Sequence, residues 1–254
     1  KLLSSPVDIL VATPGRLIDH IERGRIDFSR LEMLVLDEAD RMLDMGFIDD
    51  VERIAAATPA TRQTLLFSAT LDGVIGNLAK RLLTNPKRIS VAATQARHEN
   101  IEQRLMYVDD MAHKGRLLDH LLRDAGLNQA LVFTATKRDA DALADQLLSQ
   151  GHSAAALHGD MNQRERNRTL VSLRRGQVRI LVATDVAARG IDVPGISHVI
   201  NFDLPKAAED YVHRIGRTGR AGSSGIAVSF ASNRDAGNLQ KIERYTGQSI
   251  TAHI

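Results

Sequence analysis

Cysteine and tryptophan are missing from the 254-residue sequence, and each absence excludes certain kinds of site. Without cysteine the chain can form no disulfide, no thiolate metal site and no cysteine nucleophile. Aromatic residues make up only 4% of the sequence. Stacking of nucleobases on aromatic side chains is therefore not an expected mode of binding, and any contact with nucleic acid would depend on its backbone.

Long apolar runs and a strong net charge are also lacking. No run approaches the roughly 18 apolar residues of a membrane-spanning helix, and the first residues contain too short an apolar stretch for a signal peptide. The 33 basic and 31 acidic residues leave a net charge of +2, which does not indicate a nucleic-acid partner by itself. We expect a soluble, cytoplasmic protein without membrane contact, in which binding sites depend on local clusters.

Short apolar runs alternate with helical patterns along the chain. The runs are Ile9–Ala12, Met33–Leu36, Thr64–Phe67, Ile89–Val91, Leu105–Val108, Ala130–Phe133, Ala154–Leu157, Ile180–Ala183, His198–Ile200 and Ile226–Phe230. Continuous apolar strands separated by helices are typical of parallel sheets that helices cover on both faces. The sequence therefore predicts an α/β fold with parallel sheets.

Capping residues mark the boundaries of two of the expected helices. Thr136 and Asp139 have the spacing of a capping box, and Gly151 is placed to end the helix that follows. Asn162 and Glu165 have the same spacing and predict the start of a second helix.

The regular pattern lapses between residues 92 and 100, where the sequence is polar and has no periodicity. Such a composition is typical of a linker between domains. Four apolar runs precede this stretch and six follow it. We predict an incomplete first domain over residues 1–93, a linker over 94–100 and a complete second domain over 101–254.

An acidic cluster follows one of the expected strands. Asp37, Glu38 and Asp40 come directly after the run Met33–Leu36. Ligands of parallel α/β sheets lie beyond the carboxyl ends of the strands, and phosphate-transfer enzymes place a carboxylate for Mg²⁺ there. Nearly all the polar candidates of this sequence occupy such positions, although a solvated acidic turn is the more common explanation of one cluster alone.

A basic cluster occupies residues 213–220, in which His213, Arg214, Arg217 and Arg220 are interspersed with glycines. Glycine allows the backbone to approach a ligand closely, and guanidinium groups bind phosphate oxygens in pairs. Alone, the cluster could be a basic surface turn. Together with the acidic cluster, it indicates the charge-neutralising half of a phosphoryl-transfer centre.

Two further segments are polar but less informative. Residues 183–192 follow an expected strand and supply a hydroxyl, two carboxylates and an arginine. Residues 163–168, with Arg174 and Arg175, are rich in arginine. A solvated helix face stabilised by ion pairs would explain the second segment equally well.

Five motifs of the sequence resemble those of the DEAD-box RNA helicases in their order and spacing. They are Thr13-Pro14-Gly15-Arg16-Leu17, Asp37-Glu38-Ala39-Asp40, Ser68-Ala69-Thr70, residues 183–192 and residues 213–220. The resemblance covers essentially the whole chain, and residues 41–47 further resemble the bacterial branch. It implies two RecA-like domains, ATP and Mg²⁺ as cofactors, and RNA as the partner.

The resemblance also implies residue roles at the nucleotide. Asp37 would organise Mg²⁺ through water, and Glu38 would position or activate the attacking water. Asp192 would hold the ribose, while Arg217 and Arg220 would act as arginine fingers from the second domain. The residues that would couple the nucleotide to RNA are Asp40, Ser68, Thr70 and His213, the last being counted with the catalytic group.

For RNA, the resemblance implies contacts from both domains with phosphates and 2′-hydroxyls. The first domain would use Thr13, Gly15 and Arg16. The second would use Thr136, Gln163, Arg166, Thr184 and Gly190. Such contacts make binding largely independent of base sequence and sensitive to salt, and the family separates short duplexes locally by bending the bound strand.

The sequence departs from the family in one respect. It contains no Gly-Lys dipeptide and therefore no Gly-x-x-x-x-Gly-Lys-Ser/Thr phosphate loop. The adenine-reading glutamine segment and the first RNA-contacting motif are absent too. We expect a truncation before residue 1, and we expect these 254 residues alone to bind ATP poorly and to hydrolyse it negligibly.

Two other readings remain open. One is an RNA-binding or regulatory module without ATPase activity, and the other is a DNA helicase of the same broad superfamily. A metalloenzyme is a poor match, because the nine histidines are scattered and form no His-Glu-x-x-His pair, and a serine hydrolase is a poor match because the sequence has no Gly-x-Ser-x-Gly elbow.

Overall fold

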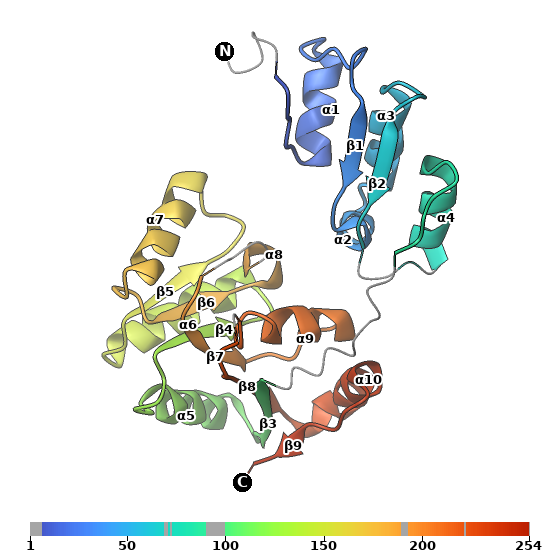
Figure 1. Cartoon of the computed structure of the whole chain (residues 1–254). Helices are drawn as coiled ribbons and strands as arrows, with labels where there is room; N and C mark the ends of the chain where they lie inside the picture. Colours follow the sequence, from blue (N-terminus) through green and yellow to red (C-terminus); the bar gives the residue numbers. More distant parts are fainter. Residues whose placement is uncertain are drawn as a thin grey trace. The chain divides into compact units, whose positions relative to one another are not determined.

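The computed structural model describes residues 7–68, 71, 73–89, 100–188, 193–220 and 222–253. The chain divides into two compact units, residues 1–89 and residues 90–254, which run from blue to teal and from green to red in Figure 1. Of the predicted linker, only Asn100 is among the described residues. Each unit is considered by itself below.

The first unit contains a short parallel sheet with helices around it. In chain order its elements are α1 (Pro14–Glu22), β1 (Met33–Leu36), α2 (Ala39–Asp44), α3 (Ile48–Ala56), β2 (Gln63–Leu66) and α4 (Gly73–Leu82). Strands β1 and β2 pair in parallel, with Met33 opposite Gln63 and Leu36 opposite Leu66. Its buried side chains include Ile18 of α1, Val51 and Ile54 of α3, and Ile75 and Leu78 of α4.

The prediction of a strand at Ile9–Ala12 is wrong in this structure. Ile9 and Val11 are 81% and 90% exposed, and no described strand pairs with this segment. An apolar run forms a strand only where a neighbour accepts its backbone hydrogen bonds, and propensity alone does not supply one. The predicted run at Ile89–Val91 lies outside the described residues except for Ile89, which is in no strand.

The second unit is built on a larger parallel sheet. Within residues 100–188, 193–220 and 222–253, seven strands pair in the order β5-β6-β4-β7-β8-β3-β9. Their bounds are β3 (Ile101–Tyr107), β4 (Gln129–Phe133), β5 (Ala154–Leu157), β6 (Ile180–Ala183), β7 (Ile196–Asn201), β8 (Gly225–Ala231) and β9 (Thr251–Ala252). All six strands predicted for this part of the chain are present and parallel, so the predicted α/β class is confirmed; the two-residue β9 was not predicted.

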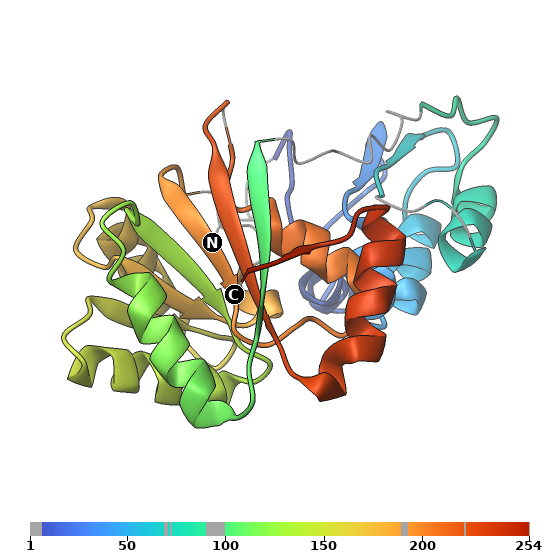
Figure 2. The same ribbon diagram turned by 90° about the horizontal axis from the view of Figure 1, so that it is seen from below.

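Helices cover both faces of this sheet. They are α5 (Met111–Leu122), α6 (Lys137–Ser149), α7 (Gln163–Arg174), α8 (Asp185–Ala188), α9 (Ala208–Ile215), the 3-10 turn Asn233–Asp235 and α10 (Ala236–Thr246). Helices α5 and α6 pack on one face and α7 to α10 on the other, and Figure 2 shows green α5 and red α10 on opposite sides of the strands. The sheet is therefore the middle of three layers.

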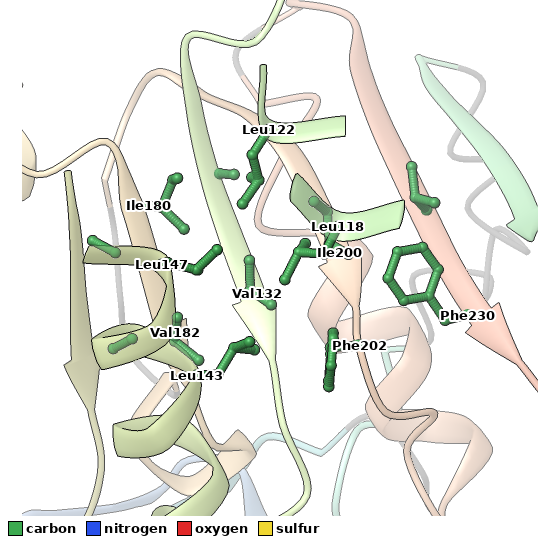
Figure 3. Packing of buried hydrophobic residues seen from close by; sticks show 14 of the residues in the cluster. Leu118, Leu122, Val132, Leu143, Leu147, Ile180, Val182, Ile200, Phe202 and Phe230 are labelled. Carbon is green, nitrogen blue, oxygen red and sulfur yellow. The ribbon is translucent and has the colours of Figure 1, made fainter. Parts of the chain in front are cut away.

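Side chains of β4 alternate between the two layers of helices. Val132 points into the cluster formed with Leu118 of α5 and Leu143 of α6, which Figure 3 shows from close by. Its neighbours Leu131 and Phe133 belong to the cluster on the opposite face. A strand that is buried on both faces must be apolar throughout, which is why these strands were visible in the sequence.

Local capping explains where two helices begin, as predicted. The Thr136 hydroxyl accepts the Asp139 N–H at 3.1 Å at the start of α6, and Gly151 follows its end with φ of +87°. At the start of α7, Asn162 and Glu165 form a reciprocal capping box. None of the described helices is long and apolar enough to cross a lipid bilayer.

Candidate functional site

The acidic turn after β1 has a strained backbone. Glu38 lies in the left-handed region with φ of 52° and ψ of 49°, which costs a residue with a Cβ about 1 kcal/mol or more. Its N–H donates to Oδ1 of Asp37 at 3.0 Å. Both side chains are exposed, so the strain holds two carboxylates in solvent at the carboxyl end of a strand.

The turn after β2 lies beside the acidic turn. The Phe67 N–H donates to the Leu36 carbonyl at 2.8 Å, and the Ala39 N–H donates to the Phe67 carbonyl at 3.0 Å. The next residue, Ser68, has a buried hydroxyl oxygen without a hydrogen-bond partner among the described atoms. Asp40 is also buried, at 6% exposure. The pairing of β1 with β2 thus brings two of the predicted motifs together, while Thr70 lies outside the described residues.

The third motif of this unit forms the start of α1. Thr13 is the N-cap residue, but its hydroxyl makes no capping hydrogen bond, and Pro14 occupies the first helical position. Thr13, Gly15 and Arg16 are all exposed. A helix N-terminus with exposed N–H groups, a hydroxyl and an arginine is suited to an anion.

The described residues contain no group of three His, Asp or Glu side chains that could hold a metal ion. This is compatible with the predicted Mg²⁺ role of Asp37. Mg²⁺ keeps several of its waters and binds through one or two carboxylates together with substrate phosphates, rather than in a cage made entirely of protein. The exposed carboxylate of Asp37 fits that pattern.

In the second unit, three adjacent strands deliver predicted RNA contacts to one edge of the sheet. Strands β5, β6 and β4 are neighbours in that order. Gln163 begins the helix after β5, Thr184 follows β6 directly and Thr136 caps the helix after β4. Because the strands are parallel, these positions share the carboxyl edge. Arg166 is half-buried there and donates to the Ala187 carbonyl at 3.4 Å, whereas Gly190 lies outside the described residues.

A buried arginine, whose structural role the sequence did not reveal, ties this edge together. Arg214 of α9 is 3% exposed, and its Nε and Nη2 donate to the two carboxylate oxygens of Asp185 at 2.6 and 2.8 Å. Its Nη1 donates to Asn201 Oδ1 at 3.1 Å and to the Asp203 carbonyl at 2.6 Å. The guanidinium also lies 4.7 Å from the centre of the Phe133 ring.

The network extends from Asp203 to the end of β4. One carboxylate oxygen of Asp203 accepts from Lys114 Nζ at 2.6 Å, and the other accepts the Ala135 N–H at 3.0 Å. Lys114 also lies 4.6 Å from the centre of the Phe202 ring. Asp185 is next to Thr184, which is buried, and Ala135 is next to Thr136, which is exposed, so the buried network supports both residues at this edge.

The residues that follow α9, 216–220, form an arginine turn that lies elsewhere on this unit. Thr218 is buried, and its hydroxyl donates to the Ile196 carbonyl at 2.6 Å at the start of β7. Gly219 packs against Ile101 at the start of β3. This turn lies beside the amino ends of β7 and β3, because α9 runs back along the sheet before β8 begins, and it is an exception to the expectation that nearly all candidates lie at carboxyl ends.

Close packing holds the arginine turn in place. A Cβ on Gly225, the first residue of β8, would lie 2.6 Å from the Gly219 nitrogen and would also collide with the Thr218 hydroxyl. His213, Arg217 and Arg220 are partly buried, and Arg220 Nε donates to the Gly216 carbonyl at 2.9 Å. Asp192, the predicted ribose contact, lies outside the described residues.

Comparison with known protein families gives two matches. Residues 1–78 match the DEAD/DEAH box helicase model, and residues 113–222 match the helicase conserved C-terminal domain. Among curated proteins, the ATP-dependent RNA helicase RhlB of Pseudomonas syringae is 48% identical over 96% of the chain. The DEAD-box ATP-dependent RNA helicase CshA of Geobacillus kaustophilus is 47% identical over 98%. The chain spans 62% and 53% of the lengths of these two relatives.

Solved structures give the same result. S. cerevisiae Dbp5 bound to RNA and ADP BeF3 aligns over 96% of this chain and 64% of its own, with a TM-score of 0.84 and 36% identity. E. coli DEAD-box protein SrmB, solved with the regulator of ribonuclease activity A, aligns with 43% identity and a TM-score of 0.59. This alignment covers 61% of this chain and 91% of the SrmB chain.

Proposed function

The chain belongs to the DEAD-box family of helicases, and from this premise we propose that it forms the RNA-binding and part of the ATP-binding surface of an RNA-dependent ATPase. The observation that carries the proposal is the placement of Thr136, Gln163 and Thr184 at the ends of three adjacent strands. A row of hydroxyl and amide groups on one sheet edge suits a nucleic-acid backbone, which repeats the same groups at every nucleotide.

RNA binding is proposed for both units. In the second unit, Thr136, Gln163 and Thr184, with Arg166 and Gly190, contact phosphates and 2′-hydroxyls. In the first, the exposed start of α1 supplies Thr13, Gly15 and Arg16. Contacts of this kind ignore base sequence, weaken with salt and distinguish RNA from DNA through the 2′-hydroxyl. The strand bound in this way is bent, and the bending separates a short duplex.

Nucleotide chemistry is proposed for the acidic turn. Asp37 would hold Mg²⁺ through water, and the ion would supply positive charge to the phosphates of ATP. Glu38, presented by its left-handed backbone, orients the attacking water and receives its proton. The exposure of both carboxylates supports these roles, since each must reach a ligand rather than a protein partner.

Roles at the nucleotide are also proposed for the arginine turn of the second unit. Arg217 and Arg220 stabilise the charge that develops on the transferred phosphoryl group, a contribution that is typically worth ~10³ to 10⁵ in rate. Asp192 holds the ribose. Asp40, Ser68, Thr70 and His213 link the nucleotide to RNA. The buried Ser68 oxygen, which has no hydrogen-bond partner among the described atoms, supports this role.

The proposal is tested by ATP hydrolysis in the full-length polypeptide that carries this chain. We expect turnover that rises on addition of RNA and rises much less with DNA of the same sequence. Glu38→Gln should abolish turnover and leave RNA binding intact, because a carboxamide cannot accept the proton. Equal stimulation by DNA would favour the DNA helicase reading, and turnover independent of nucleic acid would refute the proposal.

A second function is favoured for the 254 residues taken alone. They contain no Gly-Lys dipeptide, so nothing in them can cradle the β- and γ-phosphates as a phosphate loop does. We propose that this polypeptide alone binds RNA without hydrolysing ATP. Robust RNA-stimulated turnover by these residues alone would contradict this second proposal.

A further inference from the structure

The outward face of α7 carries a row of arginines. Arg164 and Arg168 are four residues apart, and Arg175 follows seven residues later with helical backbone angles. At 100° per residue, these three positions fall within about 40° of one another around the helix. Leu170 and Leu173, which pack on the core, lie on the opposite side. All three arginines are therefore exposed and point away from the sheet.

These arginines have no partner among the residues that the structure describes. No side-chain hydrogen bond or ion pair of Arg164, Arg168 or Arg175 occurs there, which argues against the solvated, ion-paired helix face considered above. Glu165 is the one acidic residue of α7, and its carboxylate accepts the Asn162 N–H at 2.9 Å in the capping box. By contrast, exposed Arg23 and Arg53 of the first unit each pair with an acid at 2.7 and 2.8 Å.

Positive charge is concentrated on this helix. Residues 163–175 contain five arginines and one glutamate, an excess of four positive charges, whereas the whole chain has an excess of two. Unpaired guanidinium groups on one helix face repel one another, and an anionic ligand would relieve that repulsion. The rest of the chain thus has a slight excess of acidic groups, and α7 stands out as a cationic surface.

The row begins at the proposed RNA edge and leads away from it. Gln163, a proposed RNA contact, is the residue before Arg164, and both lie at the carboxyl end of β5. From Arg164 to Arg175 the helix advances by about 16 Å. Strand β5 is at the border of the described sheet, and Figure 1 shows yellow α7 beside it at the periphery of the second unit. Beyond β5, the described sheet of this unit has no further strand.

We propose that this face, formed by Arg164, Arg168 and Arg175, binds the phosphate backbone of RNA that extends beyond the three-strand edge. The inference rests on the proposed function, since it takes that edge to be the RNA track. Arginine is suited to the task because its planar guanidinium pairs with two phosphate oxygens at once. The row makes no base contacts, so it lengthens the binding site without adding sequence preference.

The test compares short and long RNA on the full-length polypeptide that carries this chain, with ADP BeF3 present. One oligonucleotide of about six nucleotides fills only the track, and one of about 25 nucleotides extends past it. The variant Arg164→Gln/Arg168→Gln/Arg175→Gln removes three charges while keeping good helix formers. The control Arg23→Gln/Arg53→Gln/Arg244→Gln removes the same charge at exposed positions elsewhere.

We expect the α7 variant to bind the long RNA at least tenfold more weakly than wild type at moderate salt. The slope of log K against log salt should become shallower by about 2, since each lost phosphate contact with a single strand contributes about 0.7. Affinity for the short RNA should stay within twofold, and the control should match wild type on both. The single variant Arg168→Gln should show about a third of the change in slope if the triple variant does not fold.

Each other outcome overturns one idea. If wild type binds neither RNA, the proposed function fails. If wild type binds both and the α7 variant binds both equally well, the inference fails while the proposed function stands. An equal loss on short and long RNA would make these arginines part of the track itself and would also overturn the inference.

Discussion

Arg214 offers the most direct test of how the second unit supports its carboxyl edge. In the variant Arg214→Met, a side chain of similar length replaces the guanidinium that bonds Asp185, Asn201 and the Asp203 carbonyl. The variant leaves the Asp185 carboxylate without its bidentate partner and leaves two further acceptors unsatisfied. Arg214 is 3% exposed, so water replaces these bonds poorly.

The loss of stability expected for Arg214→Met follows from the burial of Arg214 and Asp185. Removing one member of a fully buried ion pair typically costs ~3–5 kcal/mol, because the other charge stays buried and unpaired. The Asp185 side chain is 30% exposed, which lets water solvate part of its charge. We therefore expect Arg214→Met to destabilise the second unit by about 2–4 kcal/mol. The exposed pair Arg23–Asp19 is the control, and Arg23→Met should cost less than about 1 kcal/mol.

Amide hydrogen exchange measures the loss of stability in each unit separately, which matters because two units need not unfold together. Peptides that cover β4 and β6 should exchange about 30- to 1,000-fold faster in Arg214→Met, since 1.4 kcal/mol corresponds to a tenfold change. Peptides that cover β1 and β2 of the first unit should be unchanged. The double variant Arg214→Met/Asp185→Leu should recover part of the loss, because it removes the orphaned charge.

The reasoning would be refuted by exchange rates in β4 and β6 that change no more in Arg214→Met than in Arg23→Met. That result would mean that the bidentate pair contributes no more than an exposed one. A double variant that is less stable than Arg214→Met by the full cost of a second core substitution would also contradict the idea of an orphaned charge. Either outcome would remove the buried network as the support of the proposed RNA edge.

Three further predictions follow from single features of the structure. Gly225→Ala should displace the arginine turn and lower the melting temperature by several degrees, because its Cβ would lie 2.6 Å from the Gly219 nitrogen. The control is Gly237→Ala on α10, whose Cβ would meet nothing within 4 Å and which should be neutral or slightly stabilising. Glu38→Gly should stabilise the first unit by up to about 1 kcal/mol, measured by hydrogen exchange of β1, because glycine adopts φ of 52° without strain. The same variant should abolish ATP turnover of the full-length polypeptide. A loss of stability would contradict the assignment of strain. Burial lowers the pKa of His198 below its usual 6.5, an effect that Asp124 opposes and Arg104 reinforces. The unfolded chain therefore binds a proton at His198 more readily, so the stability contributed by neutral His198 is complete above about pH 6.5 and falls at lower pH by no more than about 1.4 kcal/mol per pH unit. Denaturant titrations at several pH values should show a flatter dependence of stability on pH for His198→Gln. An unchanged dependence would refute burial of His198 as its cause.

Features that depend on near neighbours in the sequence were predictable. Strand β6 and most of β4 are apolar because both faces are covered, and this leaves a continuous run that can be recognised without knowing what covers it. The capping bonds of Thr136 and Asn162 join residues three positions apart. The family motifs were also visible in the sequence, because each consists of consecutive residues and the motifs follow one another in a fixed order along the chain.

The candidate site was predictable only in part. The residues expected at the carboxyl ends of β4, β5 and β6 do lie there, because a parallel sheet fixes that edge once its strands are known. The roles of Thr70, Gly190 and Asp192 stay predictions, since these residues lie outside the described part of the chain. Strand propensity failed at Ile9–Ala12, because a strand also requires a partner to pair with.

The sequence by itself determined the class of fold, six of the seven described strands of the second unit, two helix starts and the identity of the motifs. Only the tertiary structure decided that Arg214 is buried against Asp185, that the arginine turn lies at the amino ends of β3 and β7, and that the outer arginines of α7 have no acid within reach among the described residues. The physical reason is the distance along the chain. Arg214 and Asp185 are 29 residues apart, and Thr218 reaches Ile196 across 22. Charged groups and hydroxyls pair with groups that are near in space, so these pairs form only when the sheet has brought segments that are distant in sequence together.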